Sequence, residues 1–234
     1  APLGACGRST DTRALTVAVA ASLEPAFAEI AEGFAAANPG VEVRLEPGSS
    51  AALAARIADG APFAVIAGAD ASALERLGPD LVGPVTVFAT NHLAIAVPPE
   101  NPEDVRGPAD LARLGIVALC EAATPCGTYA TEVLERAGVT LSESHVSRAP
   151  DAAATLRTVT RGDADAAIVY ETDVRAAGEA ARLVALPSDE NVTARYGIAA
   201  LTAATDPALV RRFIATVVGP AGRAALRDRG FGTP

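Results

Sequence analysis

Several residue types are absent or scarce in this chain of 234 residues. It contains no Trp, no Met and only two His, and every basic residue is Arg. No apolar run approaches the ~20 residues that a membrane-spanning helix requires, so none is expected. The 19 basic and 28 acidic residues give a formal net charge of −9, and the basic residues form no cluster. An acidic chain of this kind is a poor candidate for binding nucleic acid.

The scarcity of histidine also argues against catalysis. A serine nucleophile needs a general base, yet His92 and His145 lie in unrelated contexts, and we expect both to be structural residues. The chain lacks the G-x-S-x-G, H-E-x-x-H and phosphate-loop motifs, and it has no short His/Cys pattern typical of zinc. An enzyme is therefore not expected, although a hydrolase that uses Ser22 or Ser50 stays an alternative.

The first 13 residues, APLGACGRSTDTR, differ in character from the rest of the chain. They are small and polar without hydrophobic periodicity, as a flexible tether would be. Within them, Leu3-Gly4-Ala5-Cys6 resembles the lipobox that precedes the lipidated cysteine of bacterial lipoproteins. A cloning remnant or a disordered tail is the alternative. We expect a linker with Cys6 as the lipidation site, which would anchor the protein to the outer face of the cytoplasmic membrane; a periplasmic protein is the alternative.

From Leu15 onward, short β-type runs alternate with helical patterns. The segment LTVAVA predicts a buried strand, and Leu23, Phe27, Ile30 and Phe34 then recur at helical spacing until Asn-Pro-Gly ends the pattern. Two further strand–helix pairs follow. This alternation predicts an α/β fold with a mainly parallel sheet and helices on both faces.

The rhythm changes in VTVFATNHLAIAVPPEN, where two β-rich runs are joined at Thr90 and Asn91. We interpret this segment as the passage into a second lobe, which repeats the strand–helix scheme before two β-type runs lead back. Two helices, DPALVRRFIATVV and PAGRAALRDRG, end the chain. The expected architecture is a periplasmic-binding-protein clamshell, with a ligand cleft between its lobes. Lobe I comprises residues 14–89 and 195–234, and lobe II comprises residues 90–194.

Four strand-to-helix turns combine small and hydroxyl residues. Helix N-termini offer unpaired N–H donors and the positive end of the helix dipole, so such turns suit an anion. Tyr170, at the end of the strand AAIVY, adds a phenolic hydroxyl. Any one of these residues alone is more often a simple helix cap. Together they predict an oxyanion cage built from Ala20-Ala21-Ser22, Gly48-Ser49-Ser50, Pro125-Cys126-Gly127 and Pro150-Asp151-Ala152.

Five segments resemble, in order along the chain, the molybdate-binding proteins of bacterial ABC importers, in the type 2 periplasmic-binding-protein superfamily. They are VAVAASLEPAFAEIAEGF, GSSAALAARIADGAP, TPCGTYATEVLERAG, IVYETD and GPAGRAALRDRGF. The resemblance implies an extracytoplasmic monomer that captures molybdate or tungstate and delivers it to an ABC importer permease. It implies no enzymatic activity and no cofactor, with molybdenum held only as the oxyanion.

The resemblance also assigns roles to residues. It implies hydroxyl donors from Ser22, Ser50 and Tyr170, and main-chain N–H donors from Cys126 and Ala152. Positions of second rank are Ser49, Ala21, Gly127 and Asp151. The chain departs from the family pattern at Cys126, where a small residue is usual, at Ala152, where a larger aliphatic residue is common, and at Ala64, where Asp is usual. Only Ala64 has no explanation at the level of sequence.

Neutral donors without an obligatory carboxylate acceptor favour a fully deprotonated oxyanion. Phosphate is partly protonated near neutral pH, and sulfate is smaller than molybdate, so we expect both to bind less well. A binding protein for sulfate, phosphate or another solute stays the main alternative. A ligand-sensing module of a transcription regulator would need a DNA-binding segment, which we do not recognise before Leu15 or after Phe231.

The remaining two cysteines lie in CEAATPCGTYA, residues 120–130. Their C-x5-C spacing has no further Cys or His partners for a metal, is not the C-x-x-C redox motif, and has no nearby base for a catalytic thiol. In the exported protein that the resemblance implies, we expect a disulfide between Cys120 and Cys126. It would hold the Cys126 N–H in place for the ligand.

Overall fold

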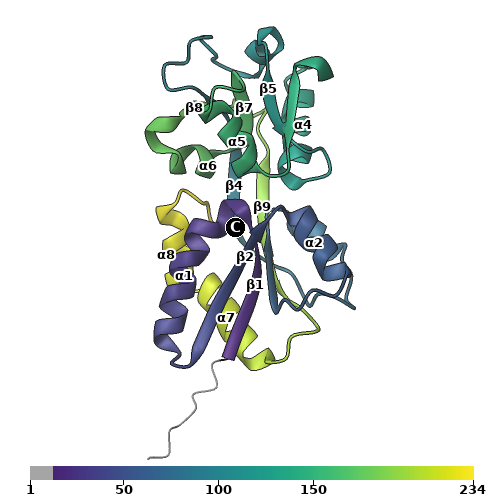
Figure 1. Ribbon diagram of the computed structural model, residues 1–234, viewed down its shortest axis with the longest axis vertical. Helices are drawn as coiled ribbons and strands as arrows, with labels where there is room; N and C mark the ends of the chain where they lie inside the picture. The colour runs from purple at the N-terminus through teal and green to yellow at the C-terminus, as the bar shows by residue number, and fades with distance from the viewer. Residues whose placement is uncertain (1–12) are drawn as a thin grey trace, which may run out of the picture.

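The computed structural model describes residues 13–234 and has two lobes, one above the other along its longest axis (Figure 1). The tether and Cys6 fall outside the described residues, apart from Arg13, which begins the first strand. The elements of lobe I are β1 (Arg13–Ala20), η1 (Ala21–Leu23), α1 (Glu24–Ala37), β2 (Val41–Gly48), α2 (Ser50–Ala58), β3 (Val65–Gly68), α3 (Ala71–Glu75), β9 (Thr193–Ala200), α7 (Pro207–Val218) and α8 (Pro220–Asp228).

Lobe II follows the long strand β4 (Thr86–Val97), which both lobes share. Its other elements are η2 (Pro108–Arg113), β5 (Val117–Cys120), α4 (Pro125–Arg136), η3 (Glu143–His145), β6 (Val146–Ala149), α5 (Ala152–Thr160), β7 (Ala166–Tyr170), α6 (Glu171–Ala176), η4 (Gly178–Ala180) and β8 (Arg182–Ala185).

One sheet runs through both lobes in the order β2-β1-β3-β9-β4-β7-β5-β6, with β8 beside β4. The strands β2, β1 and β3 are parallel, as are β7, β5 and β6. The strands β4 and β9 run antiparallel to their neighbours. The predicted two-lobed α/β class is confirmed, with a parallel group of strands in each lobe and antiparallel strands between the groups.

The connection between the lobes differs from the prediction of two β-rich runs, because β4 is a single strand of 12 residues. Its first part pairs with β9 up to His92, and its second part pairs with β7 and β8 from Leu93 onward. Residues 93–97 read as a continuous apolar run because strands flank them on both edges and they are fully buried. We propose that the boundary between the lobes lies where the partners of β4 change.

Three further features of lobe II were not specified by the sequence pattern. The segment PADLAR forms the 3-10 helix η2. The short helix α6 was not predicted, because it follows Tyr170 directly without an intervening loop. His145 lies in η3 and His92 in β4, and both side chains are exposed.

Aromatic contacts join the two ends of the chain in lobe I. Phe213 of α7 is fully buried, and its ring lies 6.3 Å from that of Phe27 and 5.2 Å from that of Phe34, both in α1. Edge-to-face contacts of this kind add to the hydrophobic gain from burial. The C-terminal helices therefore pack against α1, which begins at the predicted anion-binding turn.

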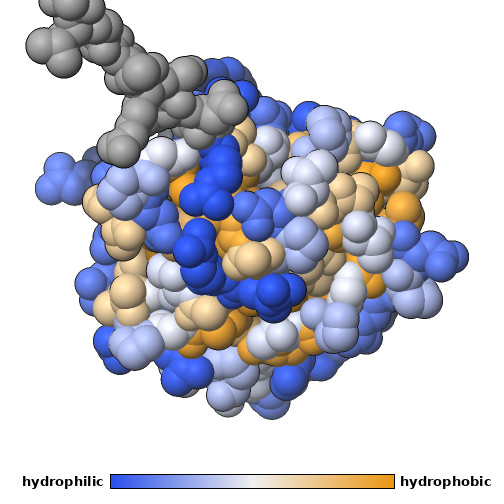
Figure 2. All heavy atoms as spheres, turned by 90° about the horizontal axis from the view of Figure 1, so that it is seen from below, coloured by the Kyte–Doolittle hydropathy of each residue, from blue (hydrophilic) through white to orange (hydrophobic). Residues whose placement is uncertain are grey.

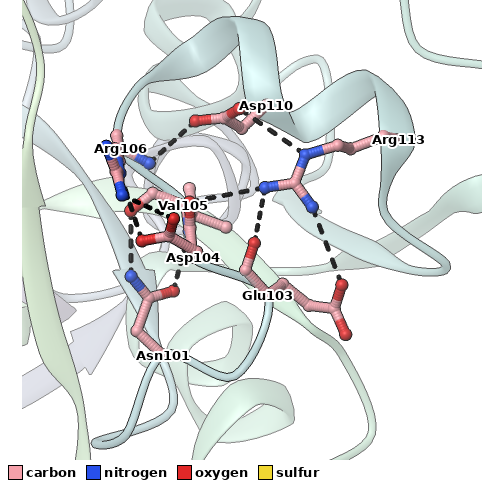
Figure 3. A network of polar contacts seen from close by, with 7 residues as sticks. All are labelled: Asn101, Glu103, Asp104, Val105, Arg106, Asp110 and Arg113. Atoms are coloured by element: carbon pink, nitrogen blue, oxygen red, sulfur yellow. Dashed lines mark hydrogen bonds and ion pairs between the residues drawn. The ribbon is translucent and has the colours of Figure 1, made fainter.

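The loop after β4 is organised by polar contacts (Figure 3). The side chain of Asn101 exchanges two hydrogen bonds with the backbone of Val105, at 2.9 and 3.0 Å. Asn101 and Asp104 have positive φ angles, which Asn and Asp tolerate better than most residues. Ion pairs of Arg106 with Asp104 and of Arg113 with Glu103 lie on the surface, where such pairs contribute little stability.

The lower end of lobe I, seen in Figure 2, has hydrophilic side chains spread between the apolar ones, so no continuous apolar patch covers this face. Among residues 13–234, no helix has the length and apolar character needed to cross a membrane.

Removing the Phe213 ring tests this packing. We expect Phe213→Ala to lower the free energy of unfolding by about 3–5 kcal/mol, because a large buried side chain is replaced by a cavity. Urea unfolding of the ligand-free protein measures the change. The neighbouring exposed Arg212→Ala is the control and should change stability by less than about 0.5 kcal/mol. Equal effects of the two substitutions would contradict the packing of α7 on α1.

Candidate functional site

The parallel strands of both lobes end at the junction between the lobes, with their carboxyl ends toward one another. In lobe I, β1, β2 and β3 end at Ala20, Gly48 and Gly68. In lobe II, β5, β6 and β7 end at positions 120, 149 and 170. In open α/β sheets, ligands bind beyond the carboxyl ends of the strands. The α5 helix of lobe II also contacts η1 of lobe I, so the lobes meet at this edge.

A cavity of about 30 Å³ lies at this junction. Organic ligands usually occupy pockets of roughly 300–1,000 Å³, so the cavity fits one small inorganic ion better than an organic molecule. All five principal residues predicted from the sequence line it, together with three of the four residues of second rank. The lining residues are Ala20, Ala21, Ser22, Gly48, Ser49, Ser50, Ala69, Thr124, Pro125, Cys126, Asp151, Ala152 and Tyr170.

Three helices begin at the cavity with the same pattern of capping. The side chains of Ser49, Thr124 and Asp151 accept the N–H of the residue three positions ahead, at 3.2, 3.2 and 2.7 Å. The N–H groups of the first two helical positions have no partner within a helix. In α4 the first of these positions is Pro125, which has no N–H, so the remaining donor is Cys126. In α5 the first donor is Ala152.

Three buried hydroxyl groups complete the lining. Ser22 lies in η1 and Ser50 at the first position of α2, so neither residue is an N-cap. The Oγ of Ser50 accepts the N–H of Ala69 at 3.1 Å, and the Oγ of Ser22 lies 3.0 Å from the hydroxyl of Tyr196. The Tyr170 hydroxyl is buried, and within the described part of the chain it has no hydrogen-bond partner. A buried hydroxyl without a partner costs free energy, which a ligand in the cavity would recover.

Gly127 and Ala64 do not line the cavity. The N–H of Gly127 is donated to Thr124, and a Cβ at this position would lie 2.1 Å from the Glu121 carbonyl oxygen, so α4 can pass this close only with glycine. Ala64 lies before β3, at the end remote from the cavity, where its backbone bonds to Thr16 and Leu201.

One of the two cysteines, Cys126, lines the cavity, and the other, Cys120, lies next to it. The sulfur atoms of Cys120 and Cys126 are 2.15 Å apart, at the distance of a disulfide bond, and the Cα atoms are 5.7 Å apart. The bridge links the end of β5 to the first turn of α4. Its position fits the expectation of a clip that holds the Cys126 N–H.

Sequence reasoning missed several residues around the cavity. Thr124 lines it and caps α4, which the Thr-Pro pair indicates in retrospect because Pro favours the first helical position. Asn91 and Tyr196 come from the strands β4 and β9, and Thr172 comes from α6. Of these residues, Asn91 is the one that the sequence could have indicated, because it is a polar residue within an apolar run, and the structure buries it.

The electrostatic surroundings are acidic on the side of lobe II. Asp151 is the one carboxylate among the described residues that line the cavity, and its Oδ1 is occupied by the Ala154 N–H. Nearby, Asp173 is partly exposed as a residue, but its Oδ2 is buried without a described hydrogen-bond partner. Burial, and secondarily the charge of Asp151, raise the pKa of Asp173 to about 7, while the backbone of Tyr170 acts in the opposite direction. Burial also raises the pKa of Tyr170, so its hydroxyl is a neutral donor.

A larger crevice of about 810 Å³ lies on the other side of Ser22, among η1, α5, α6 and α8. Exposed arginines line it, including Arg157, Arg175 and Arg227. It contains only Ser22 and Ala21 of the predicted site residues. The small cavity is therefore the better candidate for the functional site.

Within residues 13–234, no group of three or more His, Cys, Asp or Glu side chains could hold a metal ion. The cavity offers hydroxyl and N–H donors, which suit an anion and not a bare cation.

Comparison with known proteins assigns the class. The family model of the bacterial extracellular solute-binding proteins matches residues 15–232, and the chain belongs to this family. Its relatives include the molybdate-binding protein ModA of Mycobacterium tuberculosis, which is 36% identical over 97% of this chain and 88% of the relative. ModA of Haemophilus influenzae is 27% identical over 93% of this chain and 89% of the relative.

Solved structures show the same fold. The periplasmic molybdate-binding protein of Azotobacter vinelandii has a TM-score of 0.81 at 22% identity, over 94% of this chain and 99% of that one. The sulfate-binding protein SubI of Mycobacterium tuberculosis has a TM-score of 0.82 at 19% identity, over 94% of this chain and 86% of that one. The fold alone therefore does not distinguish the two anions.

The raised pKa of Asp173 predicts a pH-dependent stability. The folded protein holds this proton up to about pH 7, whereas the unfolded chain releases it near pH 3.8, so the free energy of unfolding falls as pH rises between these values. Asp173→Asn removes this contribution. The free energy of unfolding of the variant minus that of the parent should be larger at pH ~8 than at pH ~4.5, by roughly 1–3 kcal/mol.

Urea unfolding at the two pH values measures this difference. The exposed Asp163→Asn serves as the matched control and should show the same stability relative to the parent at both. An Asp173→Asn variant whose relative stability does not change with pH would show that the carboxyl is ionised throughout.

Proposed function

We propose that this protein is an extracytoplasmic binding protein that captures molybdate, and also tungstate, and delivers it to the permease of an ABC importer. The observation that carries the proposal is the cavity of about 30 Å³, which the hydroxyls of Ser22, Ser50 and Tyr170 and the N-termini of three helices line. The 36% identity to the mycobacterial ModA proteins supports molybdate as the ligand.

The donors proposed to touch the anion are the hydroxyls of Ser22, Ser50 and Tyr170 and the N–H groups of Cys126 and Ala152. An oxyanion that enters the cavity loses its hydration shell, and hydrogen bonds to neutral donors replace it. Hydrogen bonds to a charged group contribute about 1.5–3 kcal/mol each, so five of them, reduced by the cost of desolvation, are compatible with tight binding. Because the donors are neutral and the net charge is −9, attraction is local and should depend little on salt.

The lining also bears on the choice between oxyanions. Asp151 caps α5 through its Oδ1, and the other polar groups proposed to face the ion are N–H and O–H donors. This preponderance of donors disfavours phosphate, which carries a proton near neutral pH. Sulfate has the right charge but is smaller, so donors fixed at the distances of a larger ion would be too far from its oxygen atoms. A sulfate-binding protein is the second candidate, favoured by the likeness to SubI in fold.

The remaining parts of the proposal concern the cellular setting. We propose that the protein works as a monomer, without enzymatic activity, and that Cys6 anchors it to the outer face of the cytoplasmic membrane. The names of the relatives support an extracellular or periplasmic location. The lipobox-like run before Cys6 supports the anchor, and mass spectrometry of the native membrane fraction tests it.

Calorimetric titration tests the ligand. We expect molybdate and tungstate to bind tightly, and sulfate and phosphate to bind far more weakly. Tyr170→Phe should weaken molybdate by roughly 10- to 150-fold, through the loss of one hydrogen bond to a charged group. Because the Tyr170 hydroxyl has no described partner without ligand, its removal should not lower the stability of the ligand-free protein. Tyr129→Phe, outside the cavity, is the matched control.

Sulfate binding as tightly as molybdate, or no binding of any oxyanion, would contradict the proposed function. A Tyr170→Phe variant that loses stability without ligand would show that the hydroxyl is structural.

We further propose that the Cys120–Cys126 bridge is present in the working protein and that it holds the Cys126 N–H before the ligand arrives. A thiol assay on protein purified without reductant should find both cysteines blocked. Reduction, or the pair Cys120→Ser with Cys126→Ser, should weaken molybdate by a few fold, while Cys6→Ser should not. Free thiols in the purified protein, or unchanged affinity after reduction, would contradict this role.

A further inference from the structure

We propose that Tyr196 and Asn91 are specificity-determining positioning residues, which orient the Ser22 proton toward the ligand and so exclude protonated oxyanions. This inference rests on the proposed function and assigns a role to residues outside the donor set. It depends on a chain of hydrogen bonds that runs from the strands between the lobes to the cavity.

The chain begins at Asn91 of β4. Its Oδ1 accepts the N–H of His92 at 2.9 Å, which fixes the orientation of the amide, because a flipped amide would bring two donors together. The Nδ2 therefore points the other way and donates to the Thr172 Oγ1 at 2.8 Å and to the Tyr196 hydroxyl at 3.3 Å. An amide nitrogen only donates, so it cannot accept the proton of Tyr196.

This leaves one acceptor for the Tyr196 proton. Within the described chain, the hydroxyl of Tyr196 contacts only the Asn91 Nδ2 and the Ser22 Oγ, the latter at 3.0 Å. Tyr196 is fully buried, and a buried O–H without an acceptor is costly. The arrangement that satisfies every group is donation from Asn91 to Tyr196 and from Tyr196 to Ser22. The proton of Ser22 is then free to point into the cavity.

Ser50 has the same arrangement with a different donor. Its Oγ accepts the backbone N–H of Ala69 at 3.1 Å, so its own proton is also free for the anion. Both serine oxygens thus receive a hydrogen bond from the protein. Each oxygen keeps a second lone pair, but a serine that used it to accept the O–H of a ligand would have to turn its own proton away from the cavity, where the described chain offers that proton no further acceptor. The consequence is a set of hydroxyl donors held toward the cavity, which fits a fully deprotonated anion better than one that carries a proton.

The two serines differ in how easily the donor that orients each hydroxyl can be removed. The donor to Ser50 is a main-chain N–H, which a change of side chain leaves in place. The donor to Ser22 is a side-chain hydroxyl, so Tyr196→Phe removes it and keeps the ring. That ring packs edge-to-face against Tyr170 and Phe231, with centroids 5.8 and 5.3 Å away. In Tyr196→Phe, the Ser22 oxygen no longer receives this hydrogen bond, so the hydroxyl can turn and accept a hydrogen bond from the O–H of a protonated ligand.

The test compares molybdate, sulfate and phosphate in the parent protein, Tyr196→Phe and the control Tyr129→Phe, by calorimetric titration and by competition of phosphate against molybdate near pH 7. We expect Tyr196→Phe to lower the preference for molybdate over phosphate by about tenfold, the worth of one neutral hydrogen bond or slightly more. Molybdate and sulfate, which carry no proton at this pH, should be weakened equally. Tyr129→Phe should leave all three unchanged.

A double-mutant cycle shows whether Tyr196 acts through Ser22. On a Ser22→Ala background, Tyr196→Phe should no longer change the preference for molybdate over phosphate. If Tyr196→Phe does not fold, Asn91→Ala removes the donor that sets the direction and should lower the preference in the same sense.

The outcomes separate the two proposals. Phosphate that competes no better in the variants than in the parent protein, or an equal effect with and without Ser22, would overturn this inference and leave the proposed function standing. No binding of any of the three ions to the parent protein would overturn the proposed function itself.

Discussion

The structure depends on one electrostatic constraint, which is that a small charged ligand must be buried between two lobes without an opposite charge beside it. Helix N-termini meet this constraint because their first N–H groups have no partner in the helix and lie at the positive end of the dipole. The sheet brings them together, since the parallel strands of both lobes end at the same cavity. Small residues at positions 20, 21, 48 and 69 line the cavity and would let the backbone approach an ion there closely.

The caps are as important as the donors. Ser49, Thr124 and Asp151 each accept the third N–H of a helix and leave the earlier ones without a partner in the helix, as the proposed site requires. A side chain that is read as a simple cap in the sequence is thus part of the site, because it decides which donors remain. The same reasoning separates Ser49 from Ser50, since the first caps the helix and the second points its hydroxyl into the cavity.

Much of this arrangement could be predicted from the sequence, because the turns between strands and helices carry local signals. Ser22, Ser50, Cys126, Ala152 and Tyr170 all line the cavity, and the exported setting that the resemblance implies indicated the bridge. The rest depends on long-range pairing. Strand β4 reads as two runs because its partners change along its length, and the contact between residues 22 and 196 joins positions that no local pattern connects.

The pairing of β4 with β9 has a mechanical consequence. The two strands form an antiparallel ribbon over positions 86–92 and 193–198, and this ribbon is the route by which the chain passes between the lobes. A two-stranded ribbon twists and bends more readily than it slides, because sliding breaks its ladder of hydrogen bonds. The lobes are therefore expected to rotate relative to each other as the β4–β9 ribbon bends. Since Asn91 and Tyr196 belong to this ribbon, opening of the lobes would leave the Ser22 proton oriented for the next ion.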